Sequence, residues 1–148
     1  MTYNPNFSGS GTVPASQALR NTELNNTGST LAQLTPVKIT LDGNLGTIDV
    51  SVESDVHALA GIVDENIPNG ASGNIITSGR VLNISTSAAF GMPLYLSKSG
   101  GVTDTIPDIG VGGFVAGDFV VSLGIVAKNA VSPSNKDLIV RILILGQL

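Results

Sequence analysis

Cysteine and tryptophan are absent from this chain of 148 residues, and histidine occurs once. The absence of cysteine excludes a disulfide framework and a thiolate metal site, so packing within the chain or between subunits must hold the fold. The single histidine, His57, excludes a metal site with several histidine ligands. No nucleophile motif accompanies His57, and we therefore interpret it as a turn or surface residue.

Charged residues are also sparse. Lys and Arg number 7 and Asp and Glu number 11, which gives a net charge of −4. No stretch gathers basic residues with aromatic ones, so we expect no direct binding to nucleic acid. The most apolar stretches, 114–131 and 138–146, are interrupted by charges and do not supply the ~20 apolar residues of a membrane span. Residues 1–14 have neither the basic start nor the apolar run of a secretory signal, which predicts no export route.

Most of the chain consists of short alternating segments separated by turns. In PVKITL (36–41) apolar and polar residues alternate, as a half-buried strand requires. GTIDVSV (46–52) repeats the pattern after a turn, which predicts a hairpin. Further expected strands are 59–63, 73–78, 80–85, 93–97, 119–127 and 137–145. Without any long helical period, this spacing predicts an all-β fold, an antiparallel β-barrel or sandwich.

The segment GMPLYLSKSGG (91–101) predicts another hairpin. Alternation directs Leu94 and Leu96 toward the core and Tyr95 outward. The run SKSGG then turns the chain, which places Lys98 in an exposed turn. We interpret this stretch as structural.

Residues 1–33 differ from the rest because they are rich in Asn, Ser, Thr and Gly. We therefore divide the chain into an extended, mostly irregular N-terminal arm (1–33) and a β-barrel domain (34–148). Within the arm, 16–26 could form one or two helical turns capped by Ser16, too short to persist alone in water. A flexible terminus and an arm that orders against a neighbouring subunit are both open.

The last expected strand, LIVRILIL (138–145), is apolar on both faces. An exposed edge of this composition would promote aggregation, so the strand must be covered. The cover is either a second sheet of the same chain or another subunit. Arg141 then needs a carboxylate or wet surroundings, because an unpaired buried charge is costly.

Carboxylates and glycine runs offer weaker signals of chemistry. Four acidic residues flank LAGIV (59–63), and their spacing matches no calcium loop, so we interpret them as solvated strand ends and leave a metal there open: Glu53, Asp55, Asp64 and Glu65. The glycine runs 8–11 and 110–113 precede no helix, so a phosphate cradle is not supported.

One enzyme class has chains of this length and GTID-like strands: the trimeric β-fold nucleotide hydrolases of the dUTPase type. GTIDVSV (46–52) lacks the tyrosine that follows the Asp in that family, and LILGQL (143–148) holds no glycine-rich phosphate tail. We therefore expect no enzymatic activity and no cofactor.

Several motifs from Leu59 to Leu145 carry a family resemblance. LAGIVDENIPNGASGNIITSGRVLNI (59–84) is followed by GMPLYLSKSGGVT (91–103), VSLGIVAKNA (121–130) and DLIVRILI (137–144). This order resembles that of small capsid decoration (cement) proteins of tailed bacteriophages, whose β-barrel carries a G-x-x-V-Y-x-x-x-x-G-x-V-T segment and a closing V-x-V-x-L strand. The chain departs from the pattern in its long polar arm and in the insert 104–117.

The resemblance implies a non-enzymatic virion protein, made in the host cytoplasm, that binds the major capsid protein on the outside of the shell and stabilises it as a homotrimer. The alternative is a head-fibre or tail-fibre adhesin module, because related barrels occur there. As candidate interface residues we take Tyr3, Phe7, Leu19 and Leu24 from the arm and Arg141, Leu143 and Leu145 from the last strand.

Overall fold

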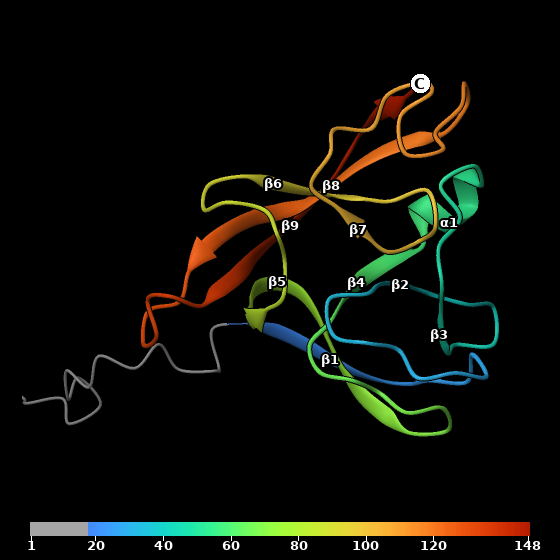
Figure 1. Ribbon diagram of the computed structural model, residues 1–148. Coiled ribbons are helices and arrows are strands. Elements are labelled where there is room, and N and C mark those ends of the chain that lie inside the picture. Colours follow the sequence, from blue (N-terminus) through green and yellow to red (C-terminus); the bar gives the residue numbers. More distant parts are fainter. Residues whose placement is uncertain (1–17) are drawn as a thin grey trace, which may run out of the picture.

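The alternation of apolar and polar residues produces one antiparallel sheet (Figure 1). A computed structural model describes residues 18–148, with 47% strand and 4% helix. The all-β prediction is therefore confirmed. The elements are β1 (Leu19–Leu24), β2 (Pro36–Ile39), β3 (Leu45–Gly46), α1 (Glu53–His57), β4 (Leu59–Val63), β5 (Ser72–Ile84), β6 (Pro93–Leu96), β7 (Val102–Thr103), β8 (Phe119–Lys128) and β9 (Lys136–Gln147).

Hydrogen-bonded neighbours follow the order β3-β2-β4-β5-β9-β8-β6-β7, and β1 pairs with β5 outside this path. The sheet is not closed. It curves around a main core to which β4, β5, β6, β8 and β9 all contribute buried side chains. A second, smaller cluster packs β2, β3, β4 and β5 against the loops that carry Leu31 and Ile67.

Strand β5 joins the two parts of the sheet. The sequence predicts two strands here, 73–78 and 80–85, whereas the chain forms one strand of 13 residues. Its first part pairs with β1 and β4, and from Gly79 onward it pairs with β9. Gly79 has a φ of +110°, which a residue with a side chain rarely adopts. This glycine marks the point where the partner strand changes.

The boundary predicted for the arm at residue 33 lies too far along the chain. Residues 19–24 are a strand of the sheet and not a short helix, because the backbone groups along the edge of β5 offer them hydrogen bonds. Asn25 is fully buried, and its side-chain amide donates to the carbonyls of Ser29 and Ile67. Leu31 belongs to the smaller core cluster. Residues 18–33 are therefore part of the folded domain.

The hairpin predicted around residues 36–52 is shorter than expected. β3 ends at Gly46, and the chain then passes through turns into the helix α1. Ile48 and Val50 still point inward and are 4% and 0% exposed. The hairpin of β6 and β7 is confirmed. Tyr95 is 9% exposed and not outward as predicted, because neighbouring segments cover both faces of β6.

Candidate interaction surface

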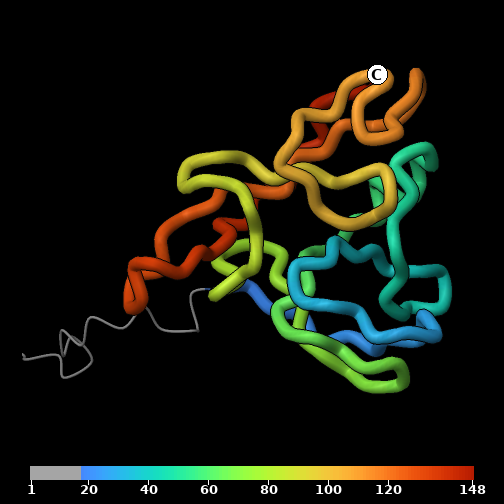
Figure 2. The backbone as a smooth tube through the Cα atoms, viewed as in Figure 1, coloured from blue at the N-terminus to red at the C-terminus, as the bar shows by residue number. Residues whose placement is uncertain are grey.

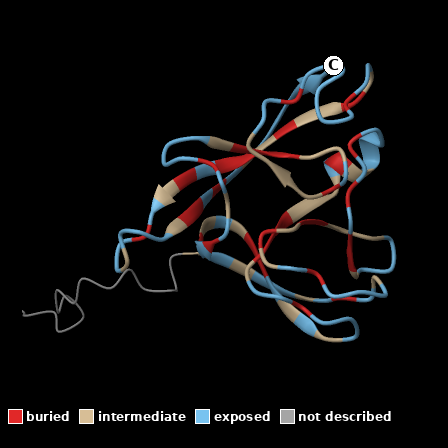
Figure 3. Ribbon diagram, in the orientation of Figure 1, coloured by how far each residue is buried: buried red, intermediate tan, exposed pale blue. Residues whose placement is uncertain are grey.

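The outward side of the ribbon formed by β8 and β9 carries large apolar side chains that no described element covers. Ile125 pairs with Ile139, and these residues are 48% and 41% exposed. Farther along β9, Leu143 and Leu145 are 42% and 57% exposed. Figure 3 shows the C-terminal part of β9 as exposed. We call the following set the β9 surface: Ile125, Ile139, Arg141, Leu143 and Leu145.

The pairing of β9 explains why this surface is open. Residues 136–140 lie between β5 and β8, and the pairing with β5 ends at Val140. Residues 141–147 pair with β8 alone among the described strands. Leu138 and Val140, on the inward side, are 0% and 5% exposed. Of the two covers predicted for this strand, a second sheet of the same chain is therefore not found within residues 18–148.

A second exposed apolar region is the loop 104–117, the insert in which the chain departs from the family pattern. Phe114, 3% exposed, anchors the loop in the main core. Four aliphatic residues of the loop are between 38% and 66% exposed: Ile106, Ile109, Val111 and Val115. The backbone N–H of Gly117 donates to Leu148 O, so the end of the loop lies beside the end of the chain (Figure 2).

Arg141 stands apart from the other basic residues. Of the seven Lys and Arg residues, Arg141 alone has a side chain without a hydrogen bond, ion pair or ring contact within residues 18–148. The other six pair with carboxylates, backbone carbonyls or the ring of Phe90. Arg141 is exposed, so its charge is solvated, which is the second of the two alternatives that the sequence left open.

Lys98 lies in the predicted turn, but its side chain is only partly exposed and forms an ion pair. Its Nζ lies 2.7 Å from Oδ1 of Asp118, whose side chain is 1% exposed. The backbone N–H of Val115 donates to the other carboxylate oxygen at 2.8 Å. Burial raises the pKa of Asp118, but the hydrogen bonds from Lys98 and Val115 outweigh it and hold the pKa below its ordinary value. This pair fixes the loop 104–117 to the turn after β6.

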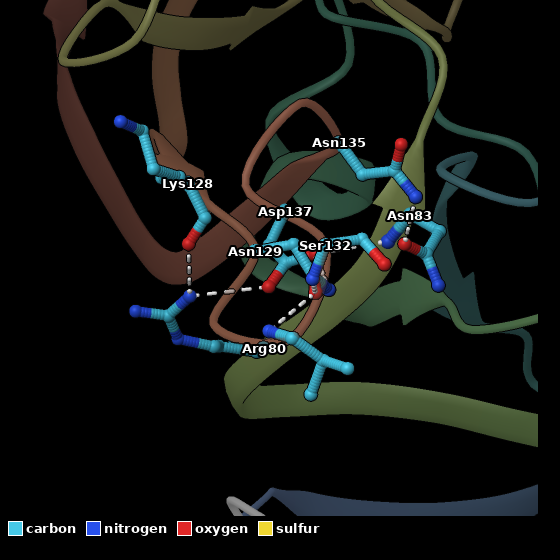
Figure 4. A network of polar contacts seen from close by, with 8 residues as sticks. Arg80, Asn83, Lys128, Asn129, Ser132, Asn135 and Asp137 are labelled. Atoms are coloured by element: carbon cyan, nitrogen blue, oxygen red, sulfur yellow. Dashed lines mark hydrogen bonds and ion pairs between the residues drawn. The ribbon is translucent and has the colours of Figure 1, made fainter.

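A second buried carboxylate, Asp137, closes the opposite end of the ribbon (Figure 4). It accepts hydrogen bonds from Arg80 Nη1 at 3.1 Å, from the Asn129 side chain at 2.9 Å and from the backbone N–H of Asn83 at 2.9 Å. Asn129 in turn accepts from the backbone N–H groups of Val131 and Ser132. Because no buried side-chain nitrogen or oxygen atom of the described residues lacks a hydrogen-bond partner, we assign this network to the structure of the β8–β9 turn.

The residues singled out for chemistry lie apart. His57 is exposed in α1, with its Nε2 3.6 Å from Glu53. Asp55 pairs with Lys38, and Asp64 pairs with Arg20 on β1. Residues 18–148 contain no group of three or more His, Asp or Glu side chains that could hold a metal ion.

The candidate interface residues fall into three groups. Tyr3 and Phe7 lie outside the described residues. Leu19 and Leu24 are 66% and 38% exposed on β1. The remaining three belong to the β9 surface. The sequence missed the apolar residues of the loop 104–117, although the Ile and Val residues within an otherwise polar turn region were a visible signal.

Aromatic side chains contribute little to the outer surface of residues 18–148. Tyr95 and Phe114 are buried, and Phe119 is packed against the main core. Phe90 is 45% exposed, and the ammonium groups of Lys128 and Lys136 lie 5.5 Å and 5.9 Å from its ring centroid. An aromatic platform for a sugar is thus limited here to a single ring that two lysines already approach.

No protein-family model matches the chain, and no curated protein matches it. Within the described part of the chain, no helix has the length and apolar character needed to cross a membrane.

Proposed function

We propose that this chain is a non-enzymatic structural protein of a bacteriophage virion, a decoration protein that binds the major capsid protein on the outside of the shell as a homotrimer. The motif order between residues 59 and 145 supports this function. The all-β fold is consistent with it.

The observation that carries the proposal is the amount of aliphatic surface exposed on the ribbon of β8 and β9 and on the loop 104–117. Monomeric soluble proteins rarely expose large contiguous apolar patches, and such patches mark interaction sites. Here the β9 surface and the loop 104–117 together expose eight large aliphatic side chains: Ile106, Ile109, Val111, Val115, Ile125, Ile139, Leu143 and Leu145. A shell-binding protein uses broad contacts of this kind, multiplied by its own oligomerisation.

The test is binding to purified, DNA-free capsids of the phage whose genome encodes the chain. We expect the protein to sediment with the capsids to a saturating, fixed ratio, and to raise the temperature at which they disrupt. Absence of co-sedimentation at micromolar protein would overturn the proposal. Binding of labelled protein to host cells in the absence of virions would instead favour the adhesin module.

A deletion variant can test whether the N-terminal arm contacts the shell. A deletion that extends to residue 30 is unsuitable. Such a deletion would remove β1 and the buried Asn25, and would damage the fold. Deletion of residues 2–17 leaves every described element intact. We expect this variant to fold and to lose capsid binding, whereas undiminished binding would exclude the arm as a shell contact. Thermal unfolding of the variant provides the control for folding.

A further inference from the structure

Arg141 places an unpaired cation within an apolar surface. It lies between Ile139 and Leu143 on β9, and it has no partner in residues 18–148 although the other six basic residues all have one. An arginine surrounded by exposed aliphatic side chains is typical of a protein interface, where Arg is enriched and its partner is a carboxylate of the other subunit.

The chain has more carboxylates than its own Lys and Arg residues pair with. Of its 11 Asp and Glu residues, four form ion pairs with Lys or Arg, namely Asp55, Asp64, Asp118 and Asp137. The remaining seven have no Lys or Arg partner within residues 18–148, and a second copy of the chain can therefore supply the charge that Arg141 lacks. The complementarity is local, because Arg141 of one copy needs a single exposed carboxylate of the other.

Asp108 is the carboxylate whose surroundings match those of Arg141. It is exposed in the loop 104–117, and one of its oxygens accepts only the backbone N–H of Ile109, at 2.7 Å. Ile106 and Ile109 beside it are 66% and 58% exposed. The loop therefore presents an acidic group among aliphatic side chains, as the β9 surface presents a basic one.

The shape of β9 favours contact through side chains over strand addition. Its pairing with β8 is interrupted by register shifts between Val120 and Val121 and between Ser122 and Gly124. Gly146 has a φ of +147°, which further breaks the regular edge. Such irregularities, together with a charged residue, are the means by which edge strands avoid pairing with another chain.

We propose that the β9 surface of one copy of this chain binds the loop 104–117 of a second copy, with Arg141 paired to Asp108 of that copy. The two patches differ, so the contact is heterologous, and its repetition forms a closed ring when the rotation between successive copies closes. This inference rests on the self-association within the proposed function and does not depend on binding to a shell.

The experiment measures the mass of the full chain by light scattering after size exclusion, without capsids. We expect the wild type to have a multiple of 15.0 kDa. Arg141→Asp and Asp108→Arg each place like charges together, and each should raise the dissociation constant roughly tenfold or more. The double variant restores opposite charges and should restore the mass. Asp42→Arg, in the exposed turn between β2 and β3, is the matched control and should leave the mass unchanged.

Each result decides the inference. A wild type of 15.0 kDa at all concentrations would overturn it, as would single variants with wild-type mass or a double variant that remains dissociated. Both residues are exposed, so circular dichroism should show the variants folded. A chain that forms the ring but does not bind capsids would contradict the proposed function and leave this inference standing.

Discussion

The two halves of β9 have similar composition and opposite surroundings. In residues 136–140, both edges of the strand are paired, and Leu138 is 0% exposed. In residues 141–147, one edge is paired among the described strands, and Leu143 and Leu145 are 42% and 57% exposed. The half that keeps both partners belongs to the core, whereas the half that loses one becomes a surface.

The cause of this difference lies in β5 and not in β9. At Gly79 the partners of β5 change from β1 and β4 to β9, so β9 loses its neighbour beyond Val140. An apolar strand is therefore buried or exposed according to distant pairing. The residue pattern of β9 itself does not show where its neighbouring strand ends.

The largest expected change in stability comes from replacing a leucine of the buried half, and the matching change in the exposed half is the comparison. We expect Leu138→Ala to lower the free energy of unfolding by about 4 kcal/mol, because it leaves a cavity in the main core. Leu143→Ala should cost less than about 1 kcal/mol in the monomer, since its side chain is already partly hydrated. Urea unfolding at a protein concentration low enough to keep the chain monomeric measures both. Equal losses would mean that the two halves do not differ in packing.

Alanine substitutions at two glycines of the ribbon distinguish the cost of backbone strain from the cost of steric crowding. Gly124 and Gly146 have φ values of +153° and +147°, but a Cβ on Gly124 would lie 2.0 Å from the carbonyl oxygen of Ile139, whereas one on Gly146 would meet nothing within 4 Å. We expect Gly124→Ala to cost about 3 kcal/mol or more and Gly146→Ala about 1 kcal/mol.

Thermal and urea unfolding of the two glycine variants measure the difference. Because the conformational strain is nearly the same, the excess for Gly124 reports how tightly β8 and β9 approach each other in the paired half. If Gly146→Ala were the more harmful change, the outer half of the ribbon would be the more constrained one.

The pattern of short alternating or apolar segments bounded by turn residues located most of the strands, including 59–63, 93–97, 119–127 and 137–145. It failed at residues 19–24, whose polar composition forms a strand only because β5 supplies the hydrogen bonds. It failed again at 46–52, where two buried side chains, Ile48 and Val50, lie outside any strand.

The candidate surface was predictable in part. The apolar outer side of LIVRILIL is visible in the sequence, and so is the isolated charge of Arg141. The pairing of Lys98 with Asp118 was not, because it joins residues 20 positions apart through the fold of the intervening loop. Short-range patterns do not encode which cation finds a partner, so the sequence predicts the turn that contains Lys98 but not its ion pair.

The smallest expected effect is a change in the pH dependence of stability, which should differ between the pair of Lys98 with Asp118 and the unpaired Arg141. Folding lowers the pKa of Asp118 below its ordinary value of 3.8, so the ionised carboxylate stabilises the fold above that value, and this contribution is lost as the pH falls from there through the lowered pKa of the folded state. We expect Asp118→Asn to cost about 2 kcal/mol at pH 7, and its unfolding free energy to fall less steeply than that of the wild type below about pH 5. Arg141→Gln, measured as a monomer, should follow the wild-type profile, because Arg141 has no carboxylate partner in the described chain. Urea unfolding from pH 7 downward measures all three profiles; an Asp118→Asn profile parallel to that of the wild type would show that the Lys98–Asp118 pair adds nothing to folding.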